Sequence, residues 1–248
     1  EETIKNNGKV FLNYDDPMIK AKHSKKGKQV SYGFSDRVDV QGNIKFYNED
    51  GQTFIGITYK KKNYELTLPI YGEQSAKNFL ASCTVAFELG LHFDEIKNAA
   101  GRLKSPAGRL NVQRYKNFIL IDDTYNANPD STKAAIELVR RIKTFKKKIL
   151  FLGDMLELGE NSKKLHQGLK DVIVKSGINE VYTIGPKMKF LQEKLNGTNL
   201  IAKNFTKRNL LMKFIKNLGF NESVILVKGS RGMRMEEFVS EIKNKSMN

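Results

Sequence analysis

Short apolar runs alternate with segments of helical periodicity from residue 118 to the end of the sequence. The apolar runs are 118–121, 149–152, 181–184 and 224–227, and helices are expected at 129–142, 165–174 and 235–242. Continuous apolar runs are typical of strands buried on both faces, and their alternation with helices predicts a parallel, doubly wound α/β sheet. Ligands of such sheets gather at the carboxyl ends of the strands.

The residues before this alternation have the pattern of a sheet followed by helices. Strands are expected at 10–12, 29–34, 43–47, 53–59 and 64–70, with Asp50-Gly51 as a hairpin turn. Apolar residues at helical spacing follow from Ala76 to Phe87, closed by Gly90, and again over 93–103. Because Ser105-Pro106-Ala107-Gly108 has the composition of a hinge, we expect two domains, residues 1–107 and 108–248.

The composition argues against a secreted or membrane protein. No apolar stretch is long enough to span a bilayer, and the acidic start of the sequence is not that of a signal peptide. The single cysteine, Cys83, shares a helical apolar pattern with Leu80 and Phe87, which favours a buried thiol over a nucleophile. A lone cysteine also fits a reducing compartment. We therefore expect a cytoplasmic protein with no membrane partner.

The sequence carries 43 Lys and Arg against 27 Asp and Glu, a net charge of +16. Nucleic-acid binding is one explanation of such a charge. The basic residues are scattered, however, and the sequence contains no Trp and no aromatic-basic motif of the RNA-recognition type. A solvated lysine-rich surface is the favoured interpretation, and it would also suit a small anionic substrate. We expect no nucleic-acid partner.

Three polar segments directly follow predicted strands. They are 122–131 (Asp-Asp-Thr-Tyr-Asn-Ala-Asn-Pro-Asp-Ser), 153–159 (Gly-Asp-Met-Leu-Glu-Leu-Gly) and 228–236 (Lys-Gly-Ser-Arg-Gly-Met-Arg-Met-Glu). The first leads into a helix N-terminus, whose backbone N–H groups suit an anion. The third combines glycines, a hydroxyl and three cations, which suits a carboxylate or a phosphate. The residues alone therefore predict an anionic ligand at the strand ends, without identifying it.

In this order and on this architecture, the three segments resemble the C-terminal domain of the Mur ligases. Gly108-Arg109-Leu110 is similar to the family's domain junction, and the segment 13–17 (Asn-Tyr-Asp-Asp-Pro) resembles part of its central domain. The sequences of these segments are most similar to those of the members that join D-alanyl-D-alanine to UDP-N-acetylmuramoyl-tripeptide. The resemblance implies a truncated central ATPase-type domain followed by a Rossmann-like doubly wound domain, in a monomer.

The resemblance also implies a reaction and a set of site residues. In the family, ATP with Mg²⁺ phosphorylates the substrate's terminal carboxylate, and an amine then attacks the acyl phosphate. By resemblance, the phosphates, the ribose and the adenine edge would be met by Arg109, Asp123 and Asn78, respectively. Three further residues would line the nucleotide site, namely Tyr125, Asn126 and Asn128. The peptide substrates would be positioned by Lys228, Ser230 and Arg231.

Several of these residues also have ordinary structural explanations. Arg109 could be a surface charge, Asp123 a helix cap, and Asn78 an exposed helical amide. Gln74-Ser75 stands where the family commonly has a His-Asn pair. For Asp154 and Glu157 we favour structural loop contacts over magnesium binding. His166 is expected to be a satisfied surface or boundary residue rather than a ligand.

Two parts of the family's catalytic apparatus are not found in the sequence. No Gly-x-x-x-x-Gly-Lys-Ser/Thr phosphate loop occurs, and the family's catalytic lysine is expected upstream of residue 1. We therefore expect a fragment of a ligase that is inactive alone, and we name no catalytic residue and no metal ligand. Three alternatives stay open: a sibling ligase that adds a single amino acid, a non-catalytic module that binds a nucleotide or precursor, and a nucleic-acid-binding protein.

Overall fold

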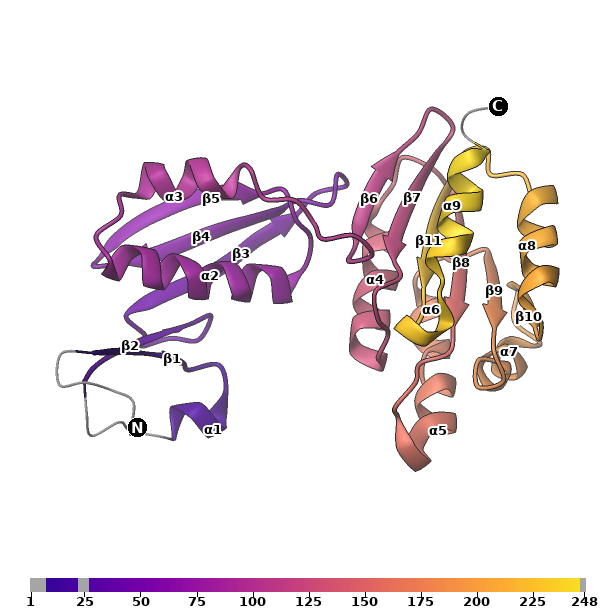
Figure 1. Cartoon of the computed structure of the whole chain (residues 1–248), viewed down its shortest axis with the longest axis horizontal. Coiled ribbons are helices and arrows are strands. Elements are labelled where there is room, and N and C mark those ends of the chain that lie inside the picture. Colours follow the sequence, from indigo (N-terminus) through magenta and orange to yellow (C-terminus); the bar gives the residue numbers. More distant parts are fainter. Residues whose placement is uncertain (1–7, 22–26, 246–248) are drawn as a thin grey trace. The chain divides into compact units, whose positions relative to one another are not determined.

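The computed structural model describes residues 8–21 and 27–245, which divide into two compact units. The first unit holds the described residues up to Asn48 together with Gln52–Lys104. The second holds Glu49–Gly51 and the described residues from Ser105 onward. Each unit has its own sheet and its own hydrophobic core (Figure 1).

The first unit is built on a five-stranded mixed sheet with the order β1-β2-β3-β4-β5. Its strands are β1 (Lys9–Asn13), β2 (Lys28–Gly33), β3 (Val40–Tyr47), β4 (Thr53–Tyr59) and β5 (Lys62–Leu68). The first three strands are parallel, whereas β3, β4 and β5 pair antiparallel. The five predicted strands are thereby confirmed, although β3 begins earlier and β5 lies two residues earlier than expected.

Helices cover one face of this sheet. They are α2 (Glu73–Glu88) and α3 (Phe93–Ala100), and a short α1 (Pro17–Lys20) follows β1. Alternate residues of β4, such as Ile55 and Ile57, point into the core with Leu80 and Cys83 of α2. Burial raises the pKa of the Cys83 thiol to about 12, so the prediction of a buried, unreactive thiol is confirmed.

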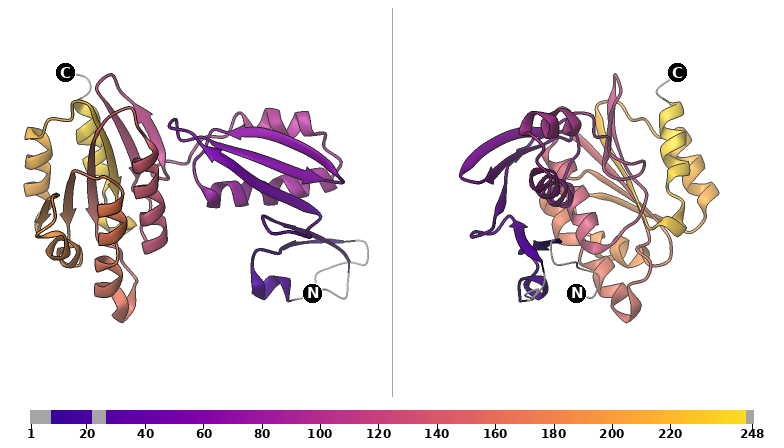
Figure 2. Two further views of the ribbon diagram at one scale, coloured as in Figure 1. Left: turned by 180° about the vertical axis from the view of Figure 1, so that it is seen from behind. Right: turned by 60° about the vertical axis from the view of Figure 1, so that its left-hand side comes forward.

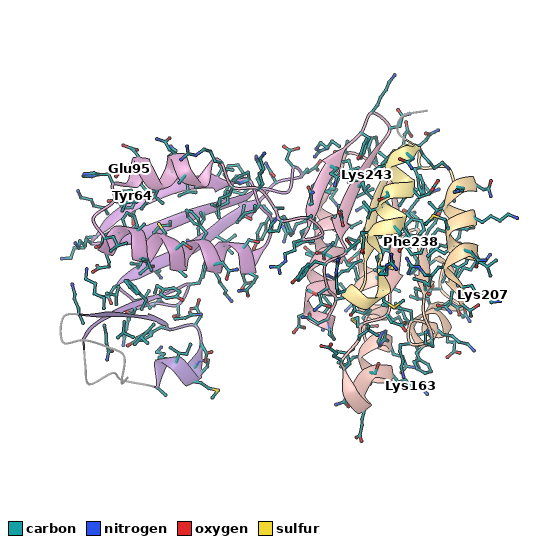
Figure 3. The ribbon with its side chains drawn as sticks, viewed as in Figure 1. Tyr64, Glu95, Lys163, Lys207, Phe238 and Lys243 are labelled. Atoms are coloured by element: carbon teal, nitrogen blue, oxygen red, sulfur yellow. The ribbon has the colours of Figure 1, made fainter. Side chains whose placement is uncertain are left out.

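The Glu95 side chain lies near the start of α3 (Figure 3). Its carboxylate accepts a hydrogen bond from the His92 N–H, with 2.8 Å between Oε2 and N. This contact caps the first turn of the helix. The α3 helix ends at Ala100, three residues before the predicted end, where Gly101 follows as its C-cap.

The second unit contains a six-stranded sheet with the order β10-β9-β8-β11-β7-β6. Its strands are β6 (Asn111–Arg114), β7 (Phe118–Asp123), β8 (Lys147–Gly153), β9 (Glu180–Ile184), β10 (Ile201–Phe205) and β11 (Ser223–Lys228). All pairs are parallel except β6 with β7. The parallel sheet is as predicted. The two edge strands β6 and β10 were not predicted, because edge strands are half exposed and their sequences lack an apolar run.

Helices cover both faces of this second sheet, as a doubly wound fold requires (Figure 2). One face packs against α8 (Arg208–Asn217) and α9 (Glu236–Asn244), whose Leu211, Ile215 and Phe238 join the core. The other side carries α4 (Pro129–Arg141), α5 (Ser162–Gln167), α6 (Lys170–Lys175) and α7 (Lys189–Leu195). The single helix expected at 165–174 is therefore two helices, and α7 and α8 were not predicted.

The position of β11 decides where the polar segments meet. This strand is the last in the sequence, yet it lies in the middle of the sheet, between β7 and β8. Lys228 at its end is in register with Asp123 of β7 and with Leu152 of β8. The carboxyl ends of these three strands therefore lie side by side, and each is followed by one of the three polar segments.

Candidate functional site

The centre of the strand-end cluster is a buried ion pair between β11 and β7. The Lys228 Nζ lies 2.6 Å from Asp123 Oδ2 and donates a second hydrogen bond of 2.9 Å to the Asn126 carbonyl. The Lys228 side chain is only 2% exposed. Burial raises the pKa of Asp123 and lowers the pKa of Lys228, and in each case the partner's charge opposes the shift.

The second oxygen of Asp123 holds the segment that enters the second unit. Asp123 Oδ1 accepts a 3.1 Å hydrogen bond from the Leu110 N–H, and the Gly108 carbonyl accepts one of 2.8 Å from the Tyr125 N–H. Gly108 has a φ of +70°, and a Cβ there would lie 2.8 Å from Tyr125 N, so only glycine fits. Between these anchors, the Arg109 guanidinium lies over the Tyr125 ring, 4.2 Å from its centroid.

Ser230 joins all three polar segments. Its hydroxyl donates to the Ala127 carbonyl at 3.2 Å and accepts from the Leu156 N–H at 2.8 Å, while its own N–H bonds the Asp154 carbonyl. Ser230 is 3% exposed. Its polar atoms therefore bind other parts of the cluster, and they fix the geometry of the loops around them.

Asp154 and His166 organise the loop that follows β8. The Asp154 carboxylate accepts hydrogen bonds from the N–H groups of Met188 (2.7 Å) and Lys187 (3.2 Å), which confirms the expected structural role. His166 is completely buried, so its predicted surface or boundary position is wrong. Its Nε2 accepts from the Met155 N–H and its Nδ1 is 2.7 Å from the Ser162 carbonyl, a pattern that requires the neutral ring. Burial lowers the pKa of His166.

Two features expected to receive an anion have other partners. At the start of α4, the Asn128 side chain accepts from the Ser131 N–H, and the Thr132 N–H bonds the Asn128 carbonyl. Pro129 has no N–H, so this helix end offers fewer free donors than predicted. Gly229 allows a close approach, but it is to Met235 and to the backbone of Gly153.

Several polar groups of the three segments remain accessible to solvent. Arg109 is exposed, and Tyr125 is 48% exposed. The Asn126 side chain is exposed, although its Oδ1 accepts from the Ala127 N–H. The Arg231 guanidinium is 69% exposed and lies 3.5 Å from Glu236. The Arg234 side chain is 72% exposed as well, so three cations and an aromatic ring face solvent at this edge. This arrangement suits an anion with a planar group.

Asn78 belongs to the first unit, where it lies on the exposed side of α2. Its Oδ1 accepts a 3.1 Å hydrogen bond from Gln74 Nε2. Both amides line a pocket of about 530 Å³, together with Lys77, Tyr32 and the segment that follows β1. The residues lining the pocket from that segment are Asn13, Asp15, Asp16, Pro17 and Met18.

Asp15 is the fixed carboxylate of this pocket. It accepts hydrogen bonds of 2.9–3.0 Å from the backbone N–H groups of Phe34 and Ser35. Burial acts to raise its pKa, but these bonds outweigh burial and lower the pKa below the ordinary value. The sequence analysis did not single out Asp15. Its only signal was the acidic turn-like segment 13–17, which does not distinguish it from Asp16, the cap of α1.

Within 8–21 and 27–245, no group of three or more His, Cys, Asp or Glu side chains has the geometry to hold a metal ion. In that part of the chain, none of the helices combines the length and apolar character needed to cross a bilayer.

Comparison with known proteins places these features in one family. Residues 2–86 match the Mur ligase middle domain, and residues 108–231 match the Mur ligase, glutamate ligase domain. A UDP-N-acetylmuramoyl-tripeptide–D-alanyl-D-alanine ligase of Haemophilus influenzae is 34% identical over 206 residues, covering 80% of this chain and 43% of that protein. The enzyme of the same name from Bacillus subtilis is 29% identical, covering 96% and 52%. The chain thus spans about half the length of the curated relatives it matches.

Solved structures share the fold. A MurF crystal structure from Acinetobacter baumannii has a TM-score of 0.84 at 24% identity, covering 96% of this chain and 52% of that one. A MurF ligase from Thermotoga maritima, solved in complex with ADP, has a TM-score of 0.77 at 24% identity, with coverages of 98% and 55%. The glutamate ligase domain alone matches half of the chain, from the Gly108 anchor through the strand-end cluster to Arg231, and the chain therefore belongs to the Mur ligase family.

Proposed function

We propose that this chain is part of an ATP-dependent ligase that joins D-alanyl-D-alanine to UDP-N-acetylmuramoyl-tripeptide in peptidoglycan precursor synthesis. Residues 1–107 would be the C-terminal part of the central domain, and 108–248 the C-terminal domain. The observation that carries the proposal is the meeting of three polar segments at the carboxyl ends of β7, β11 and β8. The names of the curated relatives support the choice of substrates.

The exposed cations suit the anions of this reaction. Phosphoryl transfer and attack on an acyl phosphate both place negative charge on oxygen atoms, and fixed cations stabilise that charge. We propose that Arg109 meets the nucleotide phosphates, with Tyr125 supporting its guanidinium from one face. Its neighbour Asn126 would complete this side of the nucleotide site, because its side chain is exposed at the same edge.

Asp123 and Asn128 have structural partners already, and we assign them second contacts only. Each carboxylate oxygen of Asp123 accepts one hydrogen bond from the chain, which leaves lone pairs for the ribose hydroxyls. The side chain of Asn128 caps α4, and only its amide NH₂ could turn toward a ligand. For the adenine edge we propose Asn78, whose NH₂ group remains available beside Gln74 in the pocket of the first unit.

The peptide substrates carry carboxylates, and Arg231 is one of the two exposed arginines of the third segment, with Arg234. We propose that Arg231 contacts them directly, while Ser230 and Lys228 hold the segment in place from beneath. Magnesium would accompany ATP, and we assign it no ligand among the described residues. A cytoplasmic location follows from this function, since ATP and nucleotide-linked precursors are cytoplasmic.

The test is phosphate release by the full reading frame that encodes this chain, supplied with ATP, magnesium and UDP-N-acetylmuramoyl-tripeptide, with and without D-alanyl-D-alanine. Turnover that requires the dipeptide would support the proposal. The 248-residue chain run in parallel is expected to be inactive, because it has no phosphate-loop sequence. Turnover with a single amino acid in place of the dipeptide would instead identify a sibling ligase.

A further inference from the structure

Lys228 is a charged side chain buried within the strand-end cluster. It extends from the end of β11, the central strand of the second sheet, and is 2% exposed. Its ammonium has two partners from the loop after β7, namely the Asp123 carboxylate and the Asn126 carbonyl. A lysine so placed has no surface to offer a substrate, so its charge must act through its neighbours.

Asp123 connects Lys228 to the backbone of Leu110. Asp123 uses Oδ2 for Lys228 and Oδ1 for the Leu110 N–H. A carboxylate held at both oxygens cannot rotate without breaking one of the bonds. The position of the Leu110 backbone is therefore fixed from β11 through one side chain.

The backbone conformation of Leu110 indicates that its hydrogen bond to Asp123 holds it in an unfavourable geometry. Its φ is +44°, in the left-handed region that residues with a Cβ such as leucine avoid. Two residues earlier, Gly108 is held by the Tyr125 N–H. Arg109 lies between these two fixed points, and its guanidinium is stacked on the Tyr125 ring.

We propose that Lys228 is a positioning residue for Arg109, acting through Asp123 and the Leu110 backbone. The ion pair holds Leu110 in its unfavourable conformation, and that conformation directs the Arg109 side chain across Tyr125. The assignment of Lys228 and Arg109 as a coupled pair follows from the contacts of the second unit alone. Its value for catalysis rests on the proposed role of Arg109 at the nucleotide phosphates.

The test follows amide hydrogen exchange and side-chain shifts by NMR in the 248-residue chain carrying Lys228→Met. An Asp123 carboxyl without its ammonium partner either takes up a proton or turns toward water, and both weaken its bond to the Leu110 N–H. We expect exchange at Leu110 to rise about tenfold or more relative to the amides of β7. The Arg109 side-chain protons, which lie over the Tyr125 ring, should move toward their random-coil shifts.

Lys148→Met is the matched control. Lys148 is also a buried lysine, 7% exposed, but it lies at the start of β8 and its Nζ binds the Arg140 carbonyl at the end of α4. Its loss should weaken the second unit without a selective change at Leu110 or Arg109. Equal exchange effects in both variants would overturn the proposal, because Lys228 would then act only on overall stability.

A second variant covers the case in which Lys228→Met does not fold. Asp123→Asn keeps the shape of the side chain but replaces the carboxylate by a weaker acceptor, and it should also release Leu110 and Arg109. Unchanged exchange at Leu110 in this variant contradicts the coupling. The proposed function is tested separately, by the KM for ATP of Arg109→Ala in the full reading frame. If that KM is unchanged, the phosphate role fails while the NMR result for Lys228 stands.

Discussion

The two units differ in where they keep their polar side chains. In the second unit, β7, β8, β9 and β11 are buried on both faces almost throughout, so polar groups are confined to the strand ends and to the loops that follow. There they bind one another, and Lys228, Ser230 and His166 are each at most 3% exposed. In the first unit, β5 alternates between exposed and buried residues, and the polar side chains of the α2 pocket remain accessible. The polar cluster of the second unit is thus held in place by buried contacts, whereas the polar pocket of the first unit is made of surface groups.

The charge is divided just as unevenly. Residues 105–248 contain 27 of the 43 basic and 14 of the 27 acidic residues, which is +13 of the total charge of +16. Exposed lysines such as Lys163 and Lys207 are spread over this unit (Figure 3). The part of the sequence that forms the strand-end cluster therefore also carries most of the excess positive charge, which would raise the local concentration of an anionic ligand.

The largest expected effect tests whether the two cores are independent. Leu80 of α2 is completely buried among the core residues of the first unit. Leu80→Ala should lower the free energy of unfolding of that unit by about 2–5 kcal/mol, through lost burial and a cavity. Two-transition thermal unfolding by calorimetry is the measurement, and only the transition of the first unit should shift.

The control for this substitution is Leu89, the C-cap residue of α2. Leu89 is 74% exposed, so Leu89→Ala should change either transition by less than about 0.5 kcal/mol. A shift of the second unit's transition by Leu80→Ala would break the comparison, since the two cores would then unfold as one.

An intermediate effect concerns the buried histidine of the second unit. The folded state keeps His166 neutral and lowers its pKa, so below the unfolded value of about 6.5 the unfolded chain binds the proton first. Stability is thus fully present above that pH and should fall by on the order of 1 kcal/mol as the pH drops toward 5. Urea unfolding at several pH values measures this loss.

Substitution assigns the pH dependence to the residue. His166→Gln should remove most of the loss between pH 7 and 5, whereas the same change at exposed His92 should preserve it. An unchanged pH profile in His166→Gln would show that other groups cause the acid sensitivity.

The smallest expected effect comes from Asn128, and it tests whether this residue only caps α4 or also contacts a ligand. Asn128 caps α4 through its side chain, and Asn128→Ala should lower the stability of the second unit by about 0.5–1 kcal/mol. Isothermal titration with ADP then asks whether the same side chain also meets a nucleotide. An affinity that falls in Asn128→Ala but is retained in Asn128→Ser, which preserves the cap, would support the ligand contact.

The sequence predicted the central strands and failed at the margins of the sheet. Apolar runs such as 149–152 identify strands that are covered on both faces, because every side chain there must be apolar. In β10, by contrast, Lys203 and Asn204 interrupt the pattern, since an edge strand has one side in water. The break of the predicted helix 165–174 near Gly168 was also invisible to periodicity, because the apolar positions continue across it.

The sequence predicted that the polar segments would meet at the strand ends, but not which groups would bind one another there. Motif order placed Asp123, Ser230 and Lys228 together, and the strand order brings them together. Their partners could not be deduced from the sequence, because Leu110 and Ala127 contribute only backbone atoms, and these are present in nearly every residue type. The role of His166 was missed for a related reason: it binds two backbone groups.

The central place of β11 has a consequence for how the second unit comes into being. Strands β7 and β8 cannot pair with each other, since the position between them is reserved for a strand about seventy residues after β8 in the sequence. During synthesis the pairs that β11 forms with β7 and β8 therefore cannot form until β11 has left the ribosome. Only then can the three polar segments meet, so we expect the strand-end cluster to form late in the folding of this unit.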